Sequence, residues 1–478
     1  MEGEEISSQE DSAVSMGERL RKWMSWGFLV TALAIYVIFN LSLRNGMLNA
    51  FFYDTNFLVG QGADFFSYYQ AGNNALNGIN VYTIPDSLAV PYLYPFRYLP
   101  YFAYIFGIII NLVPALLSYW LWVCFLAGLV CVAALRTRSL AKALGRPDWE
   151  GRIAMGIWFV FSPIYIELFV GQVTLIAGIL MFFALTSSSL VKGQDSQKSI
   201  TIFWVLSALT KTIPYFIAPV LLAAGKVRTV LVAVIVTIIA IVAVPAGLEF
   251  LQYFLAFNTA RATNVTPYPG DHSLKMLLYY LLGESSTNFS SITILLIVFF
   301  IGLAIFATLF SRDVWSCIGL FCTSYFFIML DVWEHHYTFL IPLLVLAWIR
   351  GRPEDKARWV PFVLALLMSI PMMPIVEYLS GVGPGVHPIN WSIEWQIIYH
   401  SSKVVPALIF YIWLMMTALR SPRSGSGLES ILDIFRYAWI GLITGSTPTI
   451  EQGILIRKER ESEIEEEGMI ISPKELLD

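Results

Sequence analysis

Long apolar runs without a charged residue are the feature that most limits how this chain can fold. Several of them reach the roughly 20 residues that a helix needs to cross the ~30 Å hydrocarbon core of a bilayer. The sequence therefore predicts an all-α, polytopic integral membrane protein with about 10–12 transmembrane helices, some of them partial. The clearest charge-free runs are residues 23–43, 114–135, 229–248, 289–310, 314–330, 359–376 and 404–419.

Composition excludes other classes of protein. Hydrophobic residues make up 57% of the chain and charged residues 13%, which is too apolar for a soluble globular domain. The net charge of -4 is too small to indicate a nucleic-acid partner. The four cysteines all lie within apolar runs, which is typical of small apolar core side chains and not of disulfides or metal ligands.

The distribution of Lys and Arg predicts the orientation of the chain, since cytoplasmic loops are enriched in both. Residues 1–22 end in three basic residues before a full-length apolar run, so we expect an uncleaved anchor with a cytoplasmic N-terminus. The same reasoning divides the remainder into a transmembrane domain (23–420), with a first outer loop at 44–113 and a third at 377–403, and a cytoplasmic tail (421–478).

Two segments are expected to turn back without crossing fully. Only one net crossing fits between the outer Arg97 and the cytoplasmic Arg136, so residues 98–112 are expected to form an interfacial helix. Residues 199–224 have basic residues on both sides and Lys211 in the middle. This pattern predicts two half-length helices that meet near Lys211.

The first outer loop is long, aromatic and punctuated by Gly and Pro, unlike a simple connection between helices. Asp64 begins an expected short helix over residues 63–77, and Tyr68 follows one turn later on the same face. Asp64 is either the N-cap of that helix or a functional carboxylate, and the loop alone does not decide between these roles. Asp54 and Asp86 are rival acids nearby.

A second group of ionisable residues lies at Trp333-Glu334-His335-His336. The apolar run after it, 337–349, is only about 20 Å long as a helix, so the group is expected within the outer leaflet. Charged groups at that depth are costly unless they line a polar cavity; the alternative is an interfacial loop. A zinc site is compatible with the residue types, but the spacing matches no zinc motif, so we expect no metal.

Other polar residues are expected on the same face of the membrane. Lys211 either extends its amine to the interface or neutralises an anion in a cavity, and Arg97 is a similar candidate. Gln172 lies at the turn of a predicted hairpin, and His272 and Lys275 lie in a later outer loop; each is either structural or part of a site. An acid, cations and aromatic rings together suit a lipid-phosphate sugar, because cations bind phosphate and rings stack on sugar faces.

Several motifs, taken in order, resemble glycosyltransferase family 87, the polyprenol-phosphate-mannose-dependent mannosyltransferases of the GT-C superfamily. DFFSYYQAG, LNG, VY and YLYP, between Asp64 and Pro95, are similar to the first-loop signature of that family. Phe96-Arg97 departs from it, since the family often has a second proline there. GQV, KTIP, HSL and WEHH follow in the expected order and begin at Gly171, Lys211, His272 and Trp333.

The resemblance implies a GT-C fold and inverting transfer of mannose, or a similar hexose, from a polyprenyl- or dolichyl-phosphate donor to a hydroxyl acceptor. It implies that Asp64 is the general base and that cations stabilise the departing phosphate. The donor is itself the activated sugar, so no cofactor is expected, and no Gly-rich phosphate loop is visible. The expected substrate-binding residues are Tyr68, Tyr94, Arg97, Gln172, Lys211, His272, Lys275, Glu334, His335 and His336.

The expected partners are the polyprenyl-phosphate sugar, a glycan, lipid or glycoprotein acceptor, and membrane lipids. The expected location is the plasma membrane, or the endoplasmic reticulum in a eukaryote, with the active site on the outer or luminal face and both termini cytoplasmic. Two other functions stay open. The break at Lys211 would suit a lipid-linked sugar flippase or transporter. An O-antigen-ligase-like enzyme with a lipid-diphosphate donor would instead concentrate its polar residues in a large late loop.

Overall fold

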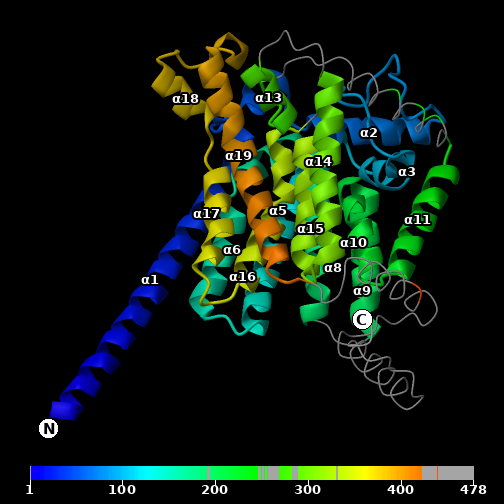
Figure 1. Ribbon diagram of the computed structural model, residues 1–478. Helices are drawn as coiled ribbons and strands as arrows, with labels where there is room; N and C mark the ends of the chain where they lie inside the picture. Colours follow the sequence, from blue (N-terminus) through cyan, green and yellow to red (C-terminus); the bar gives the residue numbers. More distant parts are fainter. Residues whose placement is uncertain are drawn as a thin grey trace, which may run out of the picture.

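The computed structural model describes residues 2–190, 194–245, 269–282, 289–329 and 332–422, together with positions 249, 252, 256 and 439. Over these residues the protein is helical, and its only strand-like contacts are two isolated bridges. Most helices stand side by side along one axis, whereas α2 (Ala63–Leu76) lies across one end of the bundle (Figure 1). The predicted all-α class is confirmed. The predicted tail, 421–478, lies almost wholly outside the described residues.

Four helices of the described part are long and apolar enough to cross a membrane, and two bent helix pairs raise that number to six if each pair is one span. Only 28% of the most apolar window of α14 is buried inside the protein, so most of its side chains face outward, where lipid would lie. The chain is therefore a multi-pass membrane protein. The four long helices are α1 (Glu2–Asn45), α5 (Ala115–Ala143), α14 (Phe289–Phe310) and α19 (Ile393–Leu419).

The bent pairs correct one sequence prediction. Residues 359–376 are predicted as one span, but the structure breaks this segment with a bend of 69°. Pro371 lies at the break, where it lacks an amide hydrogen and disfavours a helical conformation of the residue before it. The bent pairs are α6 (Asp148–Val160) with α7 (Pro163–Val170), and α17 (Trp359–Met368) with α18 (Met373–Ser380).

The start of α19 corrects a second prediction. Lys403 is expected in an outer loop that precedes the apolar run at 404–419, but the helix already begins at Ile393. His400 and Lys403 are both about 1% exposed, so they lie inside the protein. The charge of Lys403 is tolerated there because it forms an ion pair with Glu334, at 2.8 Å.

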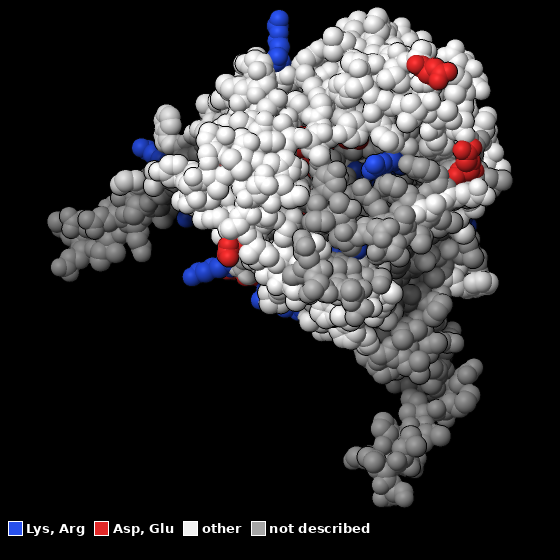
Figure 2. Space-filling model, turned by 90° about the horizontal axis from the view of Figure 1, so that it is seen from above, with Lys and Arg blue, Asp and Glu red and all other residues white. Residues whose placement is uncertain are grey.

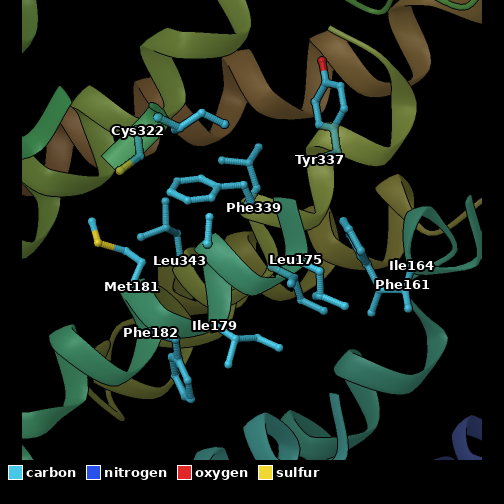
Figure 3. Close-up of a cluster of buried hydrophobic side chains, with 14 of the residues drawn as sticks. Phe161, Ile164, Leu175, Ile179, Met181, Phe182, Cys322, Tyr337, Phe339 and Leu343 are labelled. Atoms are coloured by element: carbon cyan, nitrogen blue, oxygen red, sulfur yellow. The ribbon is translucent and has the colours of Figure 1, made fainter. Parts of the chain in front are cut away.

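Shorter helices complete the bundle around an apolar core. Figure 3 shows buried apolar side chains of this core, among them Ile164, Leu175, Phe182 and Phe339. Cys322 also lies in it as a free thiol, in agreement with its prediction as a small apolar side chain. The shorter helices include α8 (Thr174–Leu190), α9 (Gln194–Thr210), α10 (Ala218–Ala223), α11 (Val227–Val242), α13 (Leu274–Leu282), α15 (Val314–Ile328) and α16 (Ile341–Arg350).

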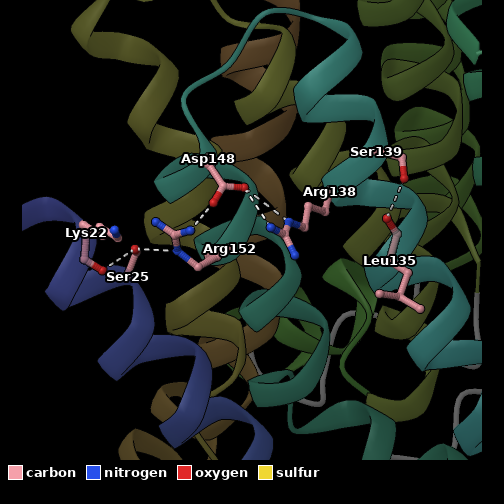
Figure 4. A network of polar contacts seen from close by, with 7 residues as sticks. All are labelled: Lys22, Ser25, Leu135, Arg138, Ser139, Asp148 and Arg152. Carbon is pink, nitrogen blue, oxygen red and sulfur yellow. Dashed lines mark hydrogen bonds and ion pairs between the residues drawn. The ribbon is translucent and has the colours of Figure 1, made fainter.

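A polar network joins three helices at the end of the bundle away from α2 (Figure 4). Asp148, in the first turn of α6, pairs with Arg138 of α5 at 3.0 Å and with Arg152 one turn along its own helix. Arg152 Nε in turn donates to Ser25 Oγ of α1 at 2.9 Å. These contacts hold α1 against the bundle at a place where apolar packing alone does not specify the register.

A short helix made of α3 (Pro100–Phe102), a π-helical turn and α4 (Ile108–Ile110) lies against α2. At about 1.5 Å per residue it is too short to cross a bilayer. The two backbones approach closely at Gly72 and Gly107. A Cβ atom on Gly72 would lie 2.1 Å from the carbonyl carbon of Gly107, so only glycine fits at this contact.

We predict that Gly72→Ala pushes this short helix off α2, displaces the first turn of α2 and lowers any activity that depends on that turn about tenfold or more. Gly128→Ala is the matched control, because a Cβ atom there, also within a helix, would meet nothing within 4 Å. Activity per mole of folded protein and thermal unfolding should be measured for both variants. Equal activity of the two variants would show that the close contact does not position the site.

Candidate active site

The N-terminus of α2 is held against the end of α7. Gly62 is the N-cap residue, with φ of +79°, and its amide donates to the Phe169 carbonyl at 2.7 Å. No side chain caps this helix. Asp64 therefore does not have the capping role that was one of its two sequence interpretations. Its half-buried carboxylate instead faces a cavity.

The cavity has a volume of about 340 Å³ and is formed by segments far apart in the sequence. It brings together seven of the eleven predicted site residues. Figure 2 looks down on the end of the bundle where α2 lies and shows a largely uncharged surface with a hollow that contains Lys or Arg side-chain atoms. The polar lining residues are Asp54, Asp64, Tyr94, Arg97, Tyr98, Gln172, Thr210, Lys211, Thr212, Tyr325, Trp333, His335 and His336.

Gln172 connects the first loop to the turn between α7 and α8. Its Oε1 accepts hydrogen bonds from Tyr68 OH at 2.7 Å, from Tyr98 OH and from the Val173 amide at 2.8 Å. Tyr68 is fully buried and does not line the cavity. It contributes to the site by holding Gln172 in place through its hydrogen bond. The turn needs Gly171, with φ of +70°, where a Cβ atom would approach Phe65 Cβ to 2.7 Å.

Lys211 lies at the break after α9, as predicted for two helices that meet near it. Its Nζ donates to Thr174 Oγ1 at 2.5 Å and reaches the cavity. Buried Glu167 is a nearby acidic residue that the sequence analysis missed. Its carboxylate accepts from the Leu175 amide at 2.7 Å. A lone acid within an apolar stretch is itself a signal of function or pairing, and it would have found Glu167.

The surroundings of Asp64 in the cavity bring the pKa of its side chain close to neutrality. Burial raises the pKa of Asp64 to about 6, and the Lys211 and Arg97 cations oppose a larger rise. Burial, together with Lys211, lowers the pKa of His335 and His336 well below the ordinary value. Both rings are therefore neutral at pH 7, and the positive charge in the cavity belongs to Lys211 and Arg97.

His336 has a defined tautomer. Its Nδ1 accepts the Trp333 amide hydrogen at 3.2 Å, so the neutral ring carries its proton on Nε2. It contributes a hydrogen-bond donor to the cavity and no charge. This changes the role expected from the sequence, in which the histidines were grouped with the cations.

Three predicted residues lie outside the cavity, in a buried polar cluster beside it. The cluster is attached to the cavity wall, because His272 N donates to Val332 O at 2.7 Å and the preceding residue bridges to Trp333. The His272 ring packs against Tyr399, with ring centroids 4.9 Å apart. Lys275 and Glu334 are also buried in this region. These residues support the wall and do not reach the space around Asp64.

Glu334 and Lys403 join the cavity wall to the rest of the bundle. Besides the ion pair with Glu334, Lys403 Nζ donates to the carbonyls of Met368 and Ile370, at 2.6 and 3.1 Å, in the bend between α17 and α18. One amine thus connects α19, this bend and the segment that carries His335. Sequence reasoning missed Lys403 because it placed the residue in a loop.

Asp54 is a second carboxylate in the cavity wall. It is 3% exposed, and its Oδ2 lies 4.0 Å from His335 Nδ1. Burial and the neighbouring carboxylates of Glu334, Asp64 and Asp271 raise its pKa well above the ordinary value. Asp54 therefore holds its proton more tightly than an exposed aspartate does. Among the described residues, no three His, Cys, Asp or Glu side chains are arranged to hold a metal ion.

Comparison with known families identifies the chain. The family model for glycosyltransferase family 87 matches residues 96–331. The chain belongs to glycosyltransferase family 87. The family match includes Arg97, Gln172 and Lys211, and it ends just before the segment with His335. Asp64 precedes the matched range, so only the geometry of the cavity bears on its role in this family 87 protein. No curated protein in the comparison matches the chain.

We predict that Lys403→Met lowers the free energy of unfolding of this family 87 protein by about 3–5 kcal/mol, because it leaves the buried Glu334 carboxylate without a counter-charge. Adding Glu334→Gln should restore a large part of that loss, since the double variant contains no unpaired charge. Thermal unfolding in one detergent measures both. An equal loss in the single and double variants would contradict a structural role for the ion pair.

Proposed function

We propose that this protein is an inverting glycosyltransferase that transfers mannose, or a similar hexose, from a polyprenyl- or dolichyl-phosphate donor to a hydroxyl group. The observation that carries the proposal is the cavity of a family 87 member in which the Asp64 carboxylate lies with two cations, Lys211 and Arg97. A base and an anion-binding group are the two functions that such a transfer needs. The family membership by itself supports only the glycosyltransferase class.

In the proposed reaction, the acceptor hydroxyl oxygen attacks the anomeric carbon of the sugar from the side opposite the phosphate. A carbon–oxygen bond forms to the acceptor as the bond to the phosphate oxygen breaks, so the anomeric configuration inverts. The hydroxyl proton passes to the Asp64 carboxylate. The bonding electron pair leaves with the lipid phosphate, which gains one negative charge. A pKa of about 6 suits a base that must be ionised at pH 7 and still accept a proton.

The cations of the cavity would stabilise the negative charge that the leaving phosphate gains. Lys211 supplies a point charge, and Arg97 a guanidinium able to bind two phosphate oxygens at once. His336 adds a neutral N–H donor from Nε2. Groups fixed before the reaction stabilise developing charge better than water that must reorient, so these donors favour departure without protonation of the phosphate.

The walls around Asp64 support a lipid-linked donor. Leu58, Leu99 and Phe102 line the cavity as apolar surface, and Tyr94 and Tyr98 supply rings for a sugar face. Just outside, the helix that packs on α2 exposes Ile105, Ile109 and Leu112, at 63, 58 and 80%. An isoprenoid chain that follows this apolar path would reach the cavity from the membrane side of that helix.

The remaining expectations form part of this proposal. The active site faces the outer or luminal side of the plasma membrane or endoplasmic reticulum, and both termini are cytoplasmic. The partners are the polyprenyl-phosphate sugar, a glycan, lipid or glycoprotein acceptor, and membrane lipids. The reaction needs no cofactor, because the phosphate ester of the donor already activates the sugar, and no nucleic acid takes part.

We predict that Asp64→Asn lowers sugar transfer from polyprenyl-phosphate mannose at least about 100-fold, since it removes the proton acceptor. The purified protein should be assayed in a membrane lipid extract as acceptor source, with release of polyprenyl phosphate as readout. Asp86→Asn is the matched control, because Asp86 belongs to the same loop but is exposed, and it should retain full activity.

Three outcomes would contradict the proposal. Near-normal transfer by Asp64→Asn would contradict the assignment of Asp64 as the general base. Transfer only from nucleotide sugars would remove the lipid-phosphate donor. Movement of the intact lipid-linked sugar across a vesicle membrane, without release of polyprenyl phosphate, would favour a flippase.

The pKa of Asp64 predicts how transfer depends on pH. The base must be ionised, so kcat/KM should be constant above about pH 7 and fall about tenfold per pH unit well below pH 6. Lys211→Met removes a charge that lowers this pKa, so the acid limb should move to higher pH. Rates from pH 4.5 to 8.5 test both statements. A limb that stays in place in the Lys211 variant would mean that another group titrates.

A further inference from the structure

A second cavity, with a volume of about 870 Å³, lies between α15, α16 and α19. Arg350 ends α16 and Arg420 follows α19, so the cavity is at the end of the bundle away from α2 (Figure 1). It shares no lining residue with the cavity around Asp64. The two cavities therefore face opposite sides of the membrane that the bundle spans.

Arginines dominate the polar part of this second cavity, with five of them against three acidic residues. Two of the five are held in place by ion pairs: Arg358 with Glu150 at 2.8 Å, and Arg420 with Asp355 at 3.1 Å. The Asp313 carboxylate is the N-cap of α15, where it accepts from the Trp315 and Ser316 amides, and its charge also acts on Arg350. The five arginines still outnumber the three acidic residues of the lining. The excess positive charge in the cavity favours an anion.

Arg350 ends α16 and Arg352 follows two residues later; both are exposed and both line the cavity. The Arg350 guanidinium lies over the Trp315 ring, with its carbon 4.0 Å from the ring centroid. This contact fixes the plane of the guanidinium while its edge stays available for hydrogen bonds. A planar donor held in this way suits a phosphate diester.

The deeper walls of the cavity are apolar. Leu343, Leu346, Phe410 and Leu414 line it between the helices. A small soluble anion would make no use of these walls. An amphiphile with an anionic head and hydrocarbon chains matches both parts, because the chains remove the apolar walls from water while the head meets the arginines.

We propose that this cavity binds an anionic phospholipid, with its phosphate at Arg350 and Arg352 and the first part of its acyl chains between α15, α16 and α19. The site belongs to the leaflet opposite the catalytic cavity. Two of the three helices that line it are continuous with catalytic elements, since α16 follows the segment with His335 and α19 carries Lys403. A bound lipid would hold these two helices together at their far ends.

The full chain should be purified and reconstituted in nanodiscs of phosphatidylcholine with increasing fractions of phosphatidylglycerol. Native mass spectrometry after release from the nanodisc counts the lipid that remains bound, and thermal unfolding reports its effect on stability. We expect the wild-type protein to retain phosphatidylglycerol about tenfold more than phosphatidylcholine, and the Arg350→Gln/Arg352→Gln double variant to lose this preference.

Arg138→Gln is the matched control, because Arg138 lies at the same end of the bundle in an exposed ion pair outside the cavity. It should keep the preference, and Arg350→Lys/Arg352→Lys should keep part of it. Equal retention of the two lipids by the wild-type protein, or an equal loss in the Arg138 variant, would overturn the proposal. Equal stabilisation by sodium phosphate alone would assign the arginines to a soluble anion and would also overturn it. If the double Gln variant does not fold, the preference of the wild-type protein for phosphatidylglycerol over phosphatidylcholine tests the proposal.

Discussion

The ion pair between Glu334 and Lys403 is the contact on which the end of this protein that contains the Asp64 cavity depends. Both groups are nearly fully buried, and they lie 2.8 Å apart in surroundings that contain little water. A charge in such a place must have a partner, because desolvation of an isolated charge costs more than the fold can supply. The requirement fixes α19 against the segment that carries His335 and His336. The same amine also binds the carbonyls in the bend of α17 and α18, so one side chain sets the position of three elements.

The first loop meets this wall from the other side. Its helix α2 has no side-chain cap, and its N-terminus is held by a hydrogen bond from Gly62 to the end of α7. The backbone contact of Gly72 with Gly107 then fixes its direction. Because both ends of α2 are held by backbone contacts, the carboxylate of Asp64 faces the cavity and not the bilayer. Rigid placement of this kind suits the proposed role of Asp64 as a base, which would have to meet one hydroxyl group in one orientation.

The two cavities use charge in different ways. Around Asp64 the charges are few and partly neutralised, and burial brings the pKa of the acid to about 6. At the other end Arg350, Arg352 and Arg420 are exposed, so the proposed anion would meet their charge without a large cost of desolvation. The helix α16 follows the segment with His335, and α19 carries Lys403, so both helices connect the arginine cavity to the wall of the Asp64 cavity.

Sequence alone determined the class of this protein and many of its helices. Charge-free runs of membrane length have few alternatives to helices, and α14 has the bounds of its run, 289–310. Lone polar residues in apolar surroundings also pointed to Lys211 and to His335, since such residues are costly without a purpose. Only the tertiary structure decided the rest. The bend at Pro371, the early start of α19 and the division of the polar residues between a cavity and its supporting cluster all depend on contacts between distant segments. Hydrophobic periodicity and local charge do not predict those contacts. The partner that makes a buried charge tolerable is brought to it by tertiary packing, and it lies far from that charge along the chain.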